Sequence, residues 1–358
     1  MRTWGITGTN GKTTTTWILA EFLNAAYITT VEVNTLARRF YTGYTTPPLD
    51  QLHAIFAEME ANGAHDCVME VSSHAIHQHR TGDTIFSGGA FTNLSEDHLD
   101  YHKTMEAYFD VKLDFARRMP KDAPYVVCLD GGYGHEMLEA CRALHGPHII
   151  PVTRKEPTFD LTGLQLVGDY NESNVLTAAV LAEAAGVPHE SIQAKIPLLK
   201  PRWGRLEFVP CAATKARVYV DFAHTPDGLE KVLTAAKGFT HGRLWVVFGA
   251  GGDRDPMKRP LMGEACAKLA DRLVVTSDNP RSEDPNEIIR QILVGIPEAK
   301  RAATQIEPDR HAAILAAIKS AAEGDVILIC GKGHETTQEI KGVKYPFDDR
   351  EVVKGFRG

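Results

Sequence analysis

Residues 8–16 read GTNGKTTTT, a glycine-rich turn that runs directly into a lysine and a series of threonines. The strand-like run TWGIT precedes this turn and a helix-like run follows it, so backbone N–H groups of the turn could surround phosphate oxygens. Lys12 would place a positive charge beside the β- and γ-phosphates, and the hydroxyl of Thr13 could reach Mg²⁺. The common GxxxxGK[ST] spacing is absent because Ile6 stands six positions before Lys12. A chance Gly-Lys-Thr is the alternative, but the flanking elements favour nucleotide binding.

Polar residues follow further apolar runs in the first half of the chain. Glu70 ends the run DCVME, which would place its carboxylate at the carboxyl edge of a sheet, where ligands of α/β proteins bind. Mg²⁺ coordination is favoured over a solvated carboxylate at a strand end. The segment Ser72–Arg80 that follows is rich in polar side chains suited to an anion, or to loop capping. His98, in FTNLSEDHLDYH, fits a metal ligand or a phosphate contact, but by itself favours a helix cap.

Four loops in the second half repeat this plan of an apolar strand followed by a polar, turn-rich segment. They are VYVDFAHTPD, VVFGAGGDRDPMKRP, VVTSDNPRSEDP and LICGKGHETTQ. Strand ends of a parallel sheet share one edge, so these loops would converge on one crevice. None is GxGxxG, and dinucleotide binding is therefore weakly supported. Lys112, in YFDVKLDFA, has the pattern of an ordinary exposed helix lysine.

The elements that must position these groups alternate between short apolar strands and longer amphipathic helices. Several strands are continuous Val/Ile/Leu runs, which is typical of a parallel sheet covered on both faces. The rhythm predicts a doubly wound α/β fold. Two prolines in KIPLLKPRWGRLE interrupt the alternation of strands and helices, which resumes after this segment. We therefore expect an N-terminal α/β domain at 1–199 and a second at 200–358.

Composition limits the partners. The 358 residues carry 39 basic and 46 acidic side chains, a net charge of −7 that gives no reason to expect nucleic acid or an anionic membrane surface. No apolar run approaches the roughly 18 residues of a membrane span, and no signal-peptide core is present. The six cysteines show no CxxC spacing and favour a reduced, buried state. These features favour a cytoplasmic protein.

The motifs in order are GITGTNGKTTTT, MEVSSH, FTNLSEDHLDYH, GDYNESN, WGRLE, VDFAHTPD, GAGGDRD, DNPR and GKGHE. Together they resemble the ATP-dependent Mur ligases, and most closely the diaminopimelate-adding (MurE) branch, over nearly the whole chain. The resemblance implies a central P-loop ATPase domain with a mostly parallel sheet, followed by a Rossmann-like C-terminal domain that binds the amino acid. It also implies ATP and Mg²⁺, with phosphorylation of a D-glutamyl-terminated muramyl-peptide acceptor. The amine of an amino acid, meso-diaminopimelate by this resemblance, then attacks the acyl phosphate.

The resemblance assigns roles by position. For ATP it implies Gly8, Thr9, Asn10, Gly11, Lys12, Thr13, Thr14, Asn171, Asn174, Arg205, Asp221 and His224. For catalysis it implies Lys12, Glu70, His98 and Lys112. For Mg²⁺ it implies Thr13, Glu70, His98 and Lys112, the last as a carbamate. For the acceptor it implies Thr45, Thr46, Ser72, Gln78 and Arg80. For the amino acid it implies Arg259, Asp278, Asn279, Arg281, Gly331 and Glu335. Arg281 would pair with the distal carboxylate of diaminopimelate, which lysine lacks.

One departure concerns the start of the chain, where the family carries a further domain that binds the UDP part of the acceptor. Here Met1 directly precedes the strand of the phosphate loop. We expect that domain to be absent, and a partner could supply it. The alternatives are a Mur-type ligase with a smaller γ-glutamyl acceptor that lacks UDP, and a nucleotide-binding subunit that needs a partner. A folylpolyglutamate synthase-like or cyanophycin-type ligase shares the ATP machinery, but DNPR and EVSSH…QHR argue against it.

Overall fold

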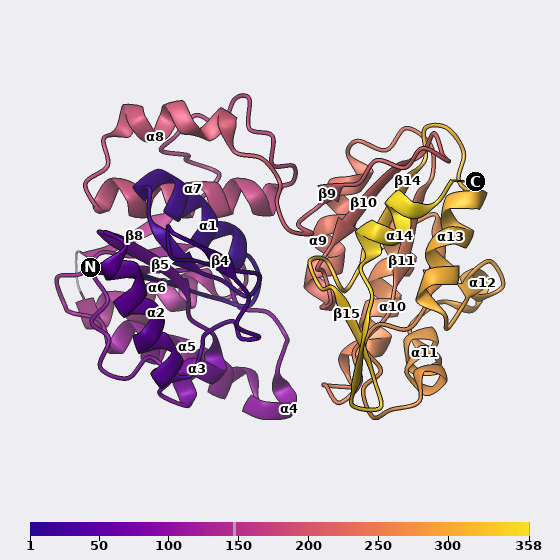
Figure 1. Cartoon of the computed structure of the whole chain (residues 1–358), viewed down its shortest axis with the longest axis horizontal. Helices are drawn as coiled ribbons and strands as arrows, with labels where there is room; N and C mark the ends of the chain where they lie inside the picture. Colours follow the sequence, from indigo (N-terminus) through magenta and orange to yellow (C-terminus); the bar gives the residue numbers. More distant parts are fainter. Residues whose placement is uncertain (146–147, 358) are drawn as a thin grey trace. The chain divides into compact units, whose positions relative to one another are not determined.

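The computed structural model describes residues 1–145 and 148–357 and divides into two compact units (Figure 1). The first unit comprises Met1–Ser95 and His102–Lys200, and the second comprises Glu96–Tyr101 and Pro201–Gly358. The chain therefore passes from one unit to the next one residue after the expected boundary. The grouping of the short segment 96–101 with the second unit was not expected. Among the described residues, no helix combines the length and the apolar character needed to cross a membrane.

In the described part of the first unit, eight strands form one sheet in the order β4-β3-β2-β5-β1-β6-β7-β8. Its strands are β1 (Arg2–Thr7), β2 (Ala26–Ile28), β3 (Val33–Asn34), β4 (Arg39–Phe40), β5 (Asp66–Glu70), β6 (Gly88–Phe91), β7 (Tyr125–Cys128) and β8 (Ile149–Val152). Strands β2, β5, β1, β6, β7 and β8 are parallel, and β3 and β4 add an antiparallel edge. The continuous apolar runs thus became central parallel strands, as the sequence predicts.

Helices cover both faces of this sheet. They are α1 (Lys12–Leu23), α2 (Leu49–Ala61), α3 (Ser73–His77), α5 (Met105–Arg117), α6 (Gly134–His145), α7 (Asp169–Ala184) and α8 (His189–Lys195), with a 3₁₀ turn η2 (Ile196–Leu198). A four-residue helix, α4 (Leu99–His102), spans the junction between the segment 96–101 and the first unit. In Figure 1, α1, α7 and α8 lie on one side of the sheet, and α2, α5 and α6 lie on the other.

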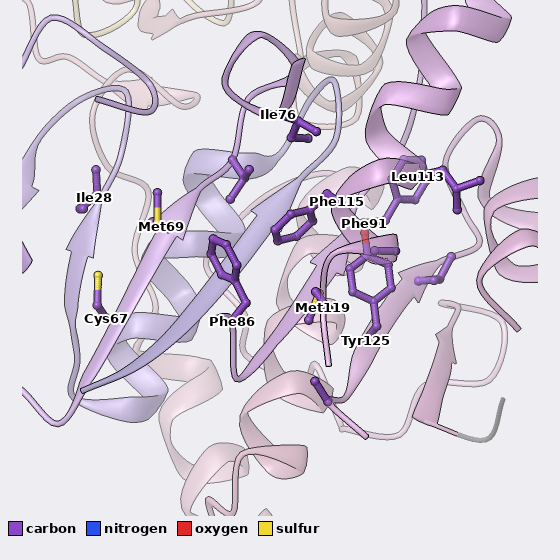
Figure 2. Close-up of a cluster of buried hydrophobic side chains, with 14 of the residues drawn as sticks. Ile28, Cys67, Met69, Ile76, Phe86, Phe91, Leu113, Phe115, Met119 and Tyr125 are labelled. Carbon is purple, nitrogen blue, oxygen red and sulfur yellow. The ribbon is translucent and has the colours of Figure 1, made fainter. Parts of the chain in front are cut away.

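The core on the α2/α5/α6 side is built from β-strand and helix residues that meet face to face. Helix α2 buries Leu52, Ile55 and Met59, the i, i+3, i+7 spacing of an amphipathic helix. Figure 2 shows Phe86 and Phe115 beside each other in this cluster, and their rings meet edge to face at 5.0 Å. This packing fixes α5, the helix that carries Lys112, against the sheet.

The described part of the second unit has a six-stranded sheet in the order β13-β12-β11-β14-β10-β9. Its strands are β9 (Glu207–Phe208), β10 (Arg217–Asp221), β11 (Leu244–Phe248), β12 (Arg272–Val275), β13 (Gln305–Ile306) and β14 (Val326–Cys330), and β15 (Thr337–Ile340) and β16 (Val343–Pro346) form a separate hairpin. All pairs are parallel except β9 with β10. The carboxyl ends of β10, β11, β12 and β14 therefore share one edge, where the four polar loops begin.

Two helical layers sandwich this second sheet. The helices are α9 (Pro226–Lys237), α10 (Lys258–Leu269), α11 (Pro285–Val294), α12 (Glu298–Arg301), α13 (Arg310–Ser320) and α14 (Asp349–Gly355). Helices α9, α10 and α11 contribute to one apolar core, and α13 and α14 contribute to the other. Helix α13 starts at Arg310 because the Asp309 carboxylate accepts a hydrogen bond from the backbone N–H of Ala312, an N-cap. Its position matters for the loops discussed below.

Candidate active site

The glycine-rich turn between β1 and α1 is held from the carboxyl end of β6. The backbone N–H of Thr9 donates to the carbonyl of Asn93 (2.8 Å), and that of Asn10 donates to Oδ1 of the same residue (3.0 Å). The hydroxyl of Thr92 donates to the carbonyl of Asn10 at 2.7 Å. The FTNL motif therefore serves as the cradle that shapes the phosphate loop.

The start of α1 is suited to an anion. Gly11 occupies the N-cap with φ +86°, no side chain caps the helix, and the first turn contains no acidic residue. Thr13 and Thr14 are buried in that turn. A helix N-terminus with these properties favours negative charge through its backbone dipoles. The geometry fits the predicted phosphate site.

Two lysines converge on this loop. Nζ of Lys12 donates to the carbonyls of Gly8 (3.0 Å) and Thr9 (2.7 Å). Nζ of Lys112, from α5, donates to the same Gly8 carbonyl at 2.8 Å. The interpretation of Lys112 as an exposed helix lysine is wrong, since it is only 1% exposed and lies over the ring of Tyr108. Two ammonium groups that share one acceptor repel each other, so the pair favours an anion beside it.

Glu70 lies at the carboxyl end of β5 with its side chain buried. Its two carboxylate oxygens accept hydrogen bonds from Thr30, from the backbone N–H at 2.8 Å and from the hydroxyl at 3.1 Å. In the described part of the chain, no three His, Cys, Asp or Glu side chains gather into a metal cluster. Glu70 is therefore one fixed carboxylate at the sheet edge. Further ligands to a cation would have to come from other groups, such as the threonine and lysine that the sequence predicts, or from phosphate.

The predicted acceptor residues form one polar network in the first unit. The hydroxyl of Thr46 donates to the carbonyl of Glu70 (2.8 Å) and accepts from the backbone N–H of Ser72 (3.0 Å). The hydroxyl oxygens of Thr45 and Thr30 lie 3.0 Å apart. This network ties the segment before α2 to the strand end that carries Glu70.

Arg80 and Gln78 extend the same network. Nε and Nη2 of Arg80 donate to Oε1 of Gln78 at 2.9 and 2.6 Å, and Nη1 donates to the carbonyl of Thr46 at 3.3 Å. The guanidinium also lies 5.6 Å from the ring of Tyr44. All five predicted acceptor residues thus take part in one connected hydrogen-bond network of the first unit, in which Thr46 is fully buried.

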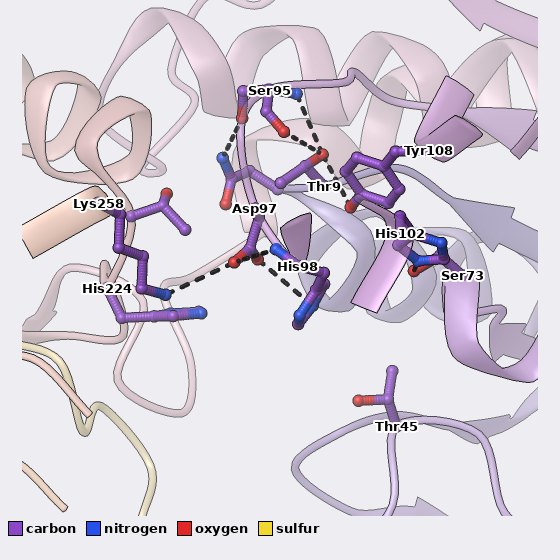
Figure 3. A network of polar contacts seen from close by, with 12 residues as sticks. Thr9, Thr45, Ser73, Ser95, Asp97, His98, His102, Tyr108, His224 and Lys258 are labelled. Atoms are coloured by element: carbon purple, nitrogen blue, oxygen red, sulfur yellow. Dashed lines mark hydrogen bonds and ion pairs between the residues drawn. The ribbon is translucent and has the colours of Figure 1, made fainter. Parts of the chain in front are cut away.

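A second chain of contacts starts at the phosphate loop and was not recognised in the sequence. The hydroxyls of Thr9 and Tyr108 lie 3.2 Å apart, and the ring of Tyr108 stacks on that of His102 at 4.9 Å (Figure 3). Nε2 of His102 lies 2.9 Å from the hydroxyl of Ser73. Tyr108 and Lys112 are four residues apart on α5, a helical spacing that places both beside the loop.

The segment 96–101 brings two more polar residues into the second unit. Oδ1 of Asp97 lies 3.5 Å from Nζ of Lys258, and its Oδ2 lies 3.4 Å from Nε2 of His98, which has φ +54° (Figure 3). Burial would raise the pKa of Asp97, but His98, Lys258 and His224 bring that pKa far below its usual value. Asp97 is therefore ionised. The side chain of His98 thus contacts a carboxylate, and His98 directly precedes α4.

The residues predicted to contact the adenosine part of ATP lie on both units. Asn174, on α7, accepts from the hydroxyl of Thr15 at 3.3 Å, and Asn171 donates to the carbonyl of Val167 at 2.7 Å. In the second unit, the Asp221 carboxylate accepts the backbone N–H groups of Leu206 (2.6 Å) and Ala223 (2.7 Å).

Next to Asp221, an aromatic platform forms around Phe222. The guanidinium of Arg205 lies 4.5 Å from the centre of that ring, and the rings of His224 and His334 lie 4.7 and 5.0 Å away. Burial, the largest cause, lowers the pKa of His224, and it lowers the pKa of His334 to about 3. Both imidazoles are therefore neutral at pH 7.

The loops after β12 and β14 carry most of the predicted amino-acid pocket, and the structure joins them. Nδ2 of Asn279 donates to Oε2 of Glu335 (2.8 Å), and Nζ of Lys332 donates to Oδ1 of Asn279 (3.1 Å) and Oε2 of Glu335 (2.7 Å). Asp278 is buried beside Gly331, where an added β-carbon would lie 2.3 Å from Oδ2 of Asp278. Lys332 was not among the residues predicted for the site, although it lies within the GKGHE motif.

Arg281 and Arg259 have different surroundings. Nη1 of Arg281 donates to the carbonyl of Gly252 at 2.6 Å, while its Nε lies 3.8 Å from Oε2 of Glu339 on the hairpin. Arg259 is buried and forms a bidentate pair with Glu283, both distances being 2.8 Å. Arg281 is thus at a loop surface. Arg259 holds the loop that follows Arg281, and its contact with substrate stays a prediction.

Comparisons with known proteins agree with this arrangement. Residues 6–159 match the family described as Mur ligase middle domain, and residues 204–333 match Mur ligase, glutamate ligase domain. The chain is 43% identical over 377 residues to UDP-N-acetylmuramoyl-L-alanyl-D-glutamate–2,6-diaminopimelate ligase from Synechococcus elongatus, covering 98% of this chain and 75% of that protein. The enzyme of the same name from Aquifex aeolicus is 41% identical, with 99% and 77% covered.

The chain belongs to the Mur ligase family. A solved structure of a diaminopimelate ligase with the same name is 32% identical, covers 99% of this chain and 77% of that one, and has a TM-score of 0.61. MurF from Acinetobacter baumannii, at 16% identity, shares the fold with a TM-score of 0.68 over 92% of this chain and 73% of that one. The predicted family, ligase class and fold class are confirmed. The expected absence of a UDP-binding domain, and with it a partner that supplies this domain, gains no support; the chain spans about three quarters of the length of these relatives.

Proposed function

We propose that this Mur ligase joins meso-diaminopimelate to the D-glutamyl end of a UDP-linked muramyl dipeptide, with conversion of ATP to ADP and phosphate. The observation that carries the proposal is the loop Asp278–Arg281, where a buried carboxylate and a loop-surface guanidinium occur together. These charges are complementary to the ammonium and the carboxylate of an amino acid. The names of the relatives at about 40% identity support this choice of substrates.

The first half-reaction is phosphoryl transfer from ATP to the terminal carboxylate of the acceptor, which gives an acyl phosphate and ADP. Two anions must approach each other, so positive charge has to lie between them. Lys12 and the N-terminus of α1 supply it from the phosphate loop. In the second half-reaction, the amine of the amino acid attacks the acyl carbon, an amide bond forms, and phosphate leaves.

Thr13, Glu70 and Lys112 would hold Mg²⁺ together with phosphate oxygens, and the cation would neutralise the charge that develops on the transferred group. The metal role of His98, which belongs to the segment 96–101 of the second unit, stays a prediction. The fixed Glu70 carboxylate fits a hard cation. Carbamylation of Lys112 would convert an ammonium into an anion at the Gly8 carbonyl, where it shares its acceptor with Lys12. This change would replace a repulsion between two cations by an attraction, which is the physical support for it.

The acceptor would bind at the hydrogen-bond network of Thr45, Thr46, Ser72, Gln78 and Arg80, in which the buried Thr46 would position its neighbours. Arg80 is suited to an anionic acceptor because Gln78 and Thr46 hold its guanidinium in one orientation. The cytoplasmic location stays a prediction that accompanies this activity, since ATP and nucleotide-linked precursors are consumed there.

The experiment is a phosphate-release assay with ATP, Mg²⁺, an acceptor and meso-diaminopimelate, each omitted in turn, with the amide product identified by mass spectrometry. The proposal is supported if phosphate is released with the UDP-linked acceptor only when all components are present. Release with a γ-glutamyl acceptor that lacks UDP, but none with the UDP-linked acceptor, would instead favour the smaller substrate. Nucleotide binding without any amino-acid-dependent release would favour a binding subunit and reject the proposal.

A further inference from the structure

A fully buried ion pair lies beneath the two loops of the amino-acid pocket. Arg310 is the first residue of α13, and Asp349 is the first residue of α14. Nε and Nη2 of Arg310 donate to the two carboxylate oxygens of Asp349, each at 2.8 Å, and both side chains are 0% exposed. None of the motifs that suggested function in the sequence contains either residue.

The remaining donors of this guanidinium reach the backbone of both loops. Nη2 also donates to the carbonyl of Cys330 at 2.9 Å, and Nη1 lies 3.4 Å from the carbonyl of Ser277. Cys330 ends β14 and directly precedes Gly331, while Ser277 directly precedes Asp278. One rigid group therefore connects the two points where the loops leave the sheet, and Asp349 fixes the plane of that group.

The two loops lie very close together at Asp278 and Gly331, the residues that follow Ser277 and Cys330. A β-carbon at Gly331 would lie 2.3 Å from Oδ2 of Asp278, and that oxygen is buried without a hydrogen-bond partner in the described part of the chain. Burial would raise the pKa of Asp278, but Lys332 and Arg310 together bring that pKa below its usual value. The loop pair thus holds an ionised carboxylate whose second oxygen is left for a donor that is not part of the chain.

We propose that the Arg310–Asp349 pair is a positioning device that sets the distance between the loop of Asp278 and the loop of Gly331, and so determines affinity for the amino-acid substrate. The inference rests on the proposed function, in which Asp278 contacts the incoming amino acid. Arg310 acts through the backbone carbonyls of Cys330 and Ser277 and does not touch substrate itself.

Stability alone is a weaker account of the pair. Replacing a buried ion pair by apolar residues of similar size is often neutral or stabilising, because desolvation of the two charges offsets their attraction. The planar fork of arginine, however, can join a carboxylate and two separate carbonyls at fixed angles. Lysine keeps the charge but cannot hold these three acceptors in one plane. Arg310→Lys therefore tests whether the orientation of the hydrogen bonds, and not the positive charge alone, is needed.

The test compares Asp349→Asn and Arg310→Lys with a matched control, Asp325→Asn. Asp325 is also a buried aspartate, and it lies at the opposite end of β14, where it accepts from the backbone N–H of Arg243 (2.8 Å) and Nε1 of Trp245 (2.9 Å). For Asp349→Asn and Arg310→Lys we expect the KM for the amino acid to rise at least about tenfold, with the KM for ATP within about twofold. Asp325→Asn should lower the Tm but leave both KM values unchanged.

A double variant, Arg310→Met/Asp349→Leu, covers the case in which the single variants fail to fold, since it leaves no orphaned charge. It should fold and still show the selective rise in the amino-acid KM. An unchanged amino-acid KM in any folded variant of the pair, or equal rises for ATP and amino acid, would overturn the inference. If the wild type itself shows no amino-acid-dependent phosphate release, the proposed function fails and the inference fails with it. If the wild type releases phosphate normally but a variant of the pair does not raise the amino-acid KM selectively, only the positioning role is rejected.

Discussion

Gly11 of the phosphate loop lies so close to Asn174 of α7 that a β-carbon at residue 11 would be 2.4 Å from the side-chain Oδ1. Asn174 also accepts from the hydroxyl of Thr15 in α1, so its amide is fixed against the first helix. The phosphate loop and α7 are therefore in close contact at residue 11, where any side chain larger than that of glycine would clash with Asn174. This relationship explains why a glycine must precede Lys12, beyond the positive φ that it adopts.

Gly11→Ala should weaken ATP binding at least about tenfold, because either the loop or Asn174 must move to accept the methyl group. Gly63→Ala is the matched control. Gly63 has φ +80°, close to the +86° of Gly11, but has no atom within 4 Å of the added carbon. Both variants carry the strain of a left-handed alanine, about 1 kcal/mol, and only Gly11→Ala carries the clash. Equal ATP affinity of the two variants in a nucleotide titration would contradict the fitted contact.

Lys12→Ala should lower kcat/KM about a hundredfold or more while the Tm stays near that of the wild type. Nζ of Lys12 donates to two loop carbonyls, those of Gly8 and Thr9, and its charge would face the expected phosphates. Losing a fixed charge beside a phosphoryl group costs on the order of 3 kcal/mol in the transition state. Steady-state kinetics with thermal unfolding provides the measurement. Turnover close to that of the wild type would refute the phosphate role of this lysine.

Glu70→Gln should reduce activity strongly and raise the Mg²⁺ concentration needed for half-maximal rate. The substitution keeps the shape of the side chain and one oxygen that can accept from Thr30, but it removes the charge that would face a cation. The pair Arg38–Glu58 provides a control, since Glu58→Gln removes a carboxylate that belongs to none of the proposed binding sites. A Mg²⁺ titration unchanged by Glu70→Gln would reject the metal role.

Much of the fold could be predicted from the sequence because its main signals are local. The central strands appear as unbroken apolar runs such as VILIC, which became β14 with all five residues buried. The two-residue strands β3 and β4 have too few residues to show a period, and their pairing depends on contacts far along the chain. The hairpin β15–β16 is mostly exposed and has no apolar face that a pattern could reveal.

The site was predicted less completely, for a different physical reason. Motif residues at strand ends could be recognised because parallel strands present their carboxyl ends at one edge. The burial of Lys112 could not be recognised from the sequence, since it depends on the Gly8 carbonyl, which lies 104 positions away in the chain. Arg310 was also missed, because only the folded chain brings it to the carbonyls of Ser277 and Cys330.

Lys112 should carry a carbamate in the active enzyme. Incubation with ¹³C-bicarbonate should give a carbamate signal in the NMR spectrum of the wild type, and Lys112→Ala should lack it. Lys112→Ala should lose activity and recover part of it with short-chain carboxylic acids, which can occupy the space beside the Gly8 carbonyl. Lys195→Ala is a suitable control, because Lys195 also donates to backbone carbonyls but belongs to α8 and is only half-buried. A free ammonium at Lys112 in the fully active enzyme would contradict this prediction.

The last prediction concerns the amino acid that is added. Arg281→Ala should raise the KM for meso-diaminopimelate by roughly ten- to a hundredfold, because a charge-assisted contact of about 1.5–3 kcal/mol is lost. The wild type should use L-lysine poorly, since lysine has no distal carboxylate that could pair with this guanidinium beside the Gly252 carbonyl and Glu339. Arg290→Ala is the matched control: Arg290 lies on α11 of the same unit, where its guanidinium pairs with the carboxylate of Glu287. The decisive quantity is the ratio of kcat/KM for the two amino acids, measured in the wild type and both variants. The ratio should fall toward one in Arg281→Ala and stay unchanged in Arg290→Ala, whereas equal use of both amino acids by the wild type would remove the basis for assigning this role to Arg281.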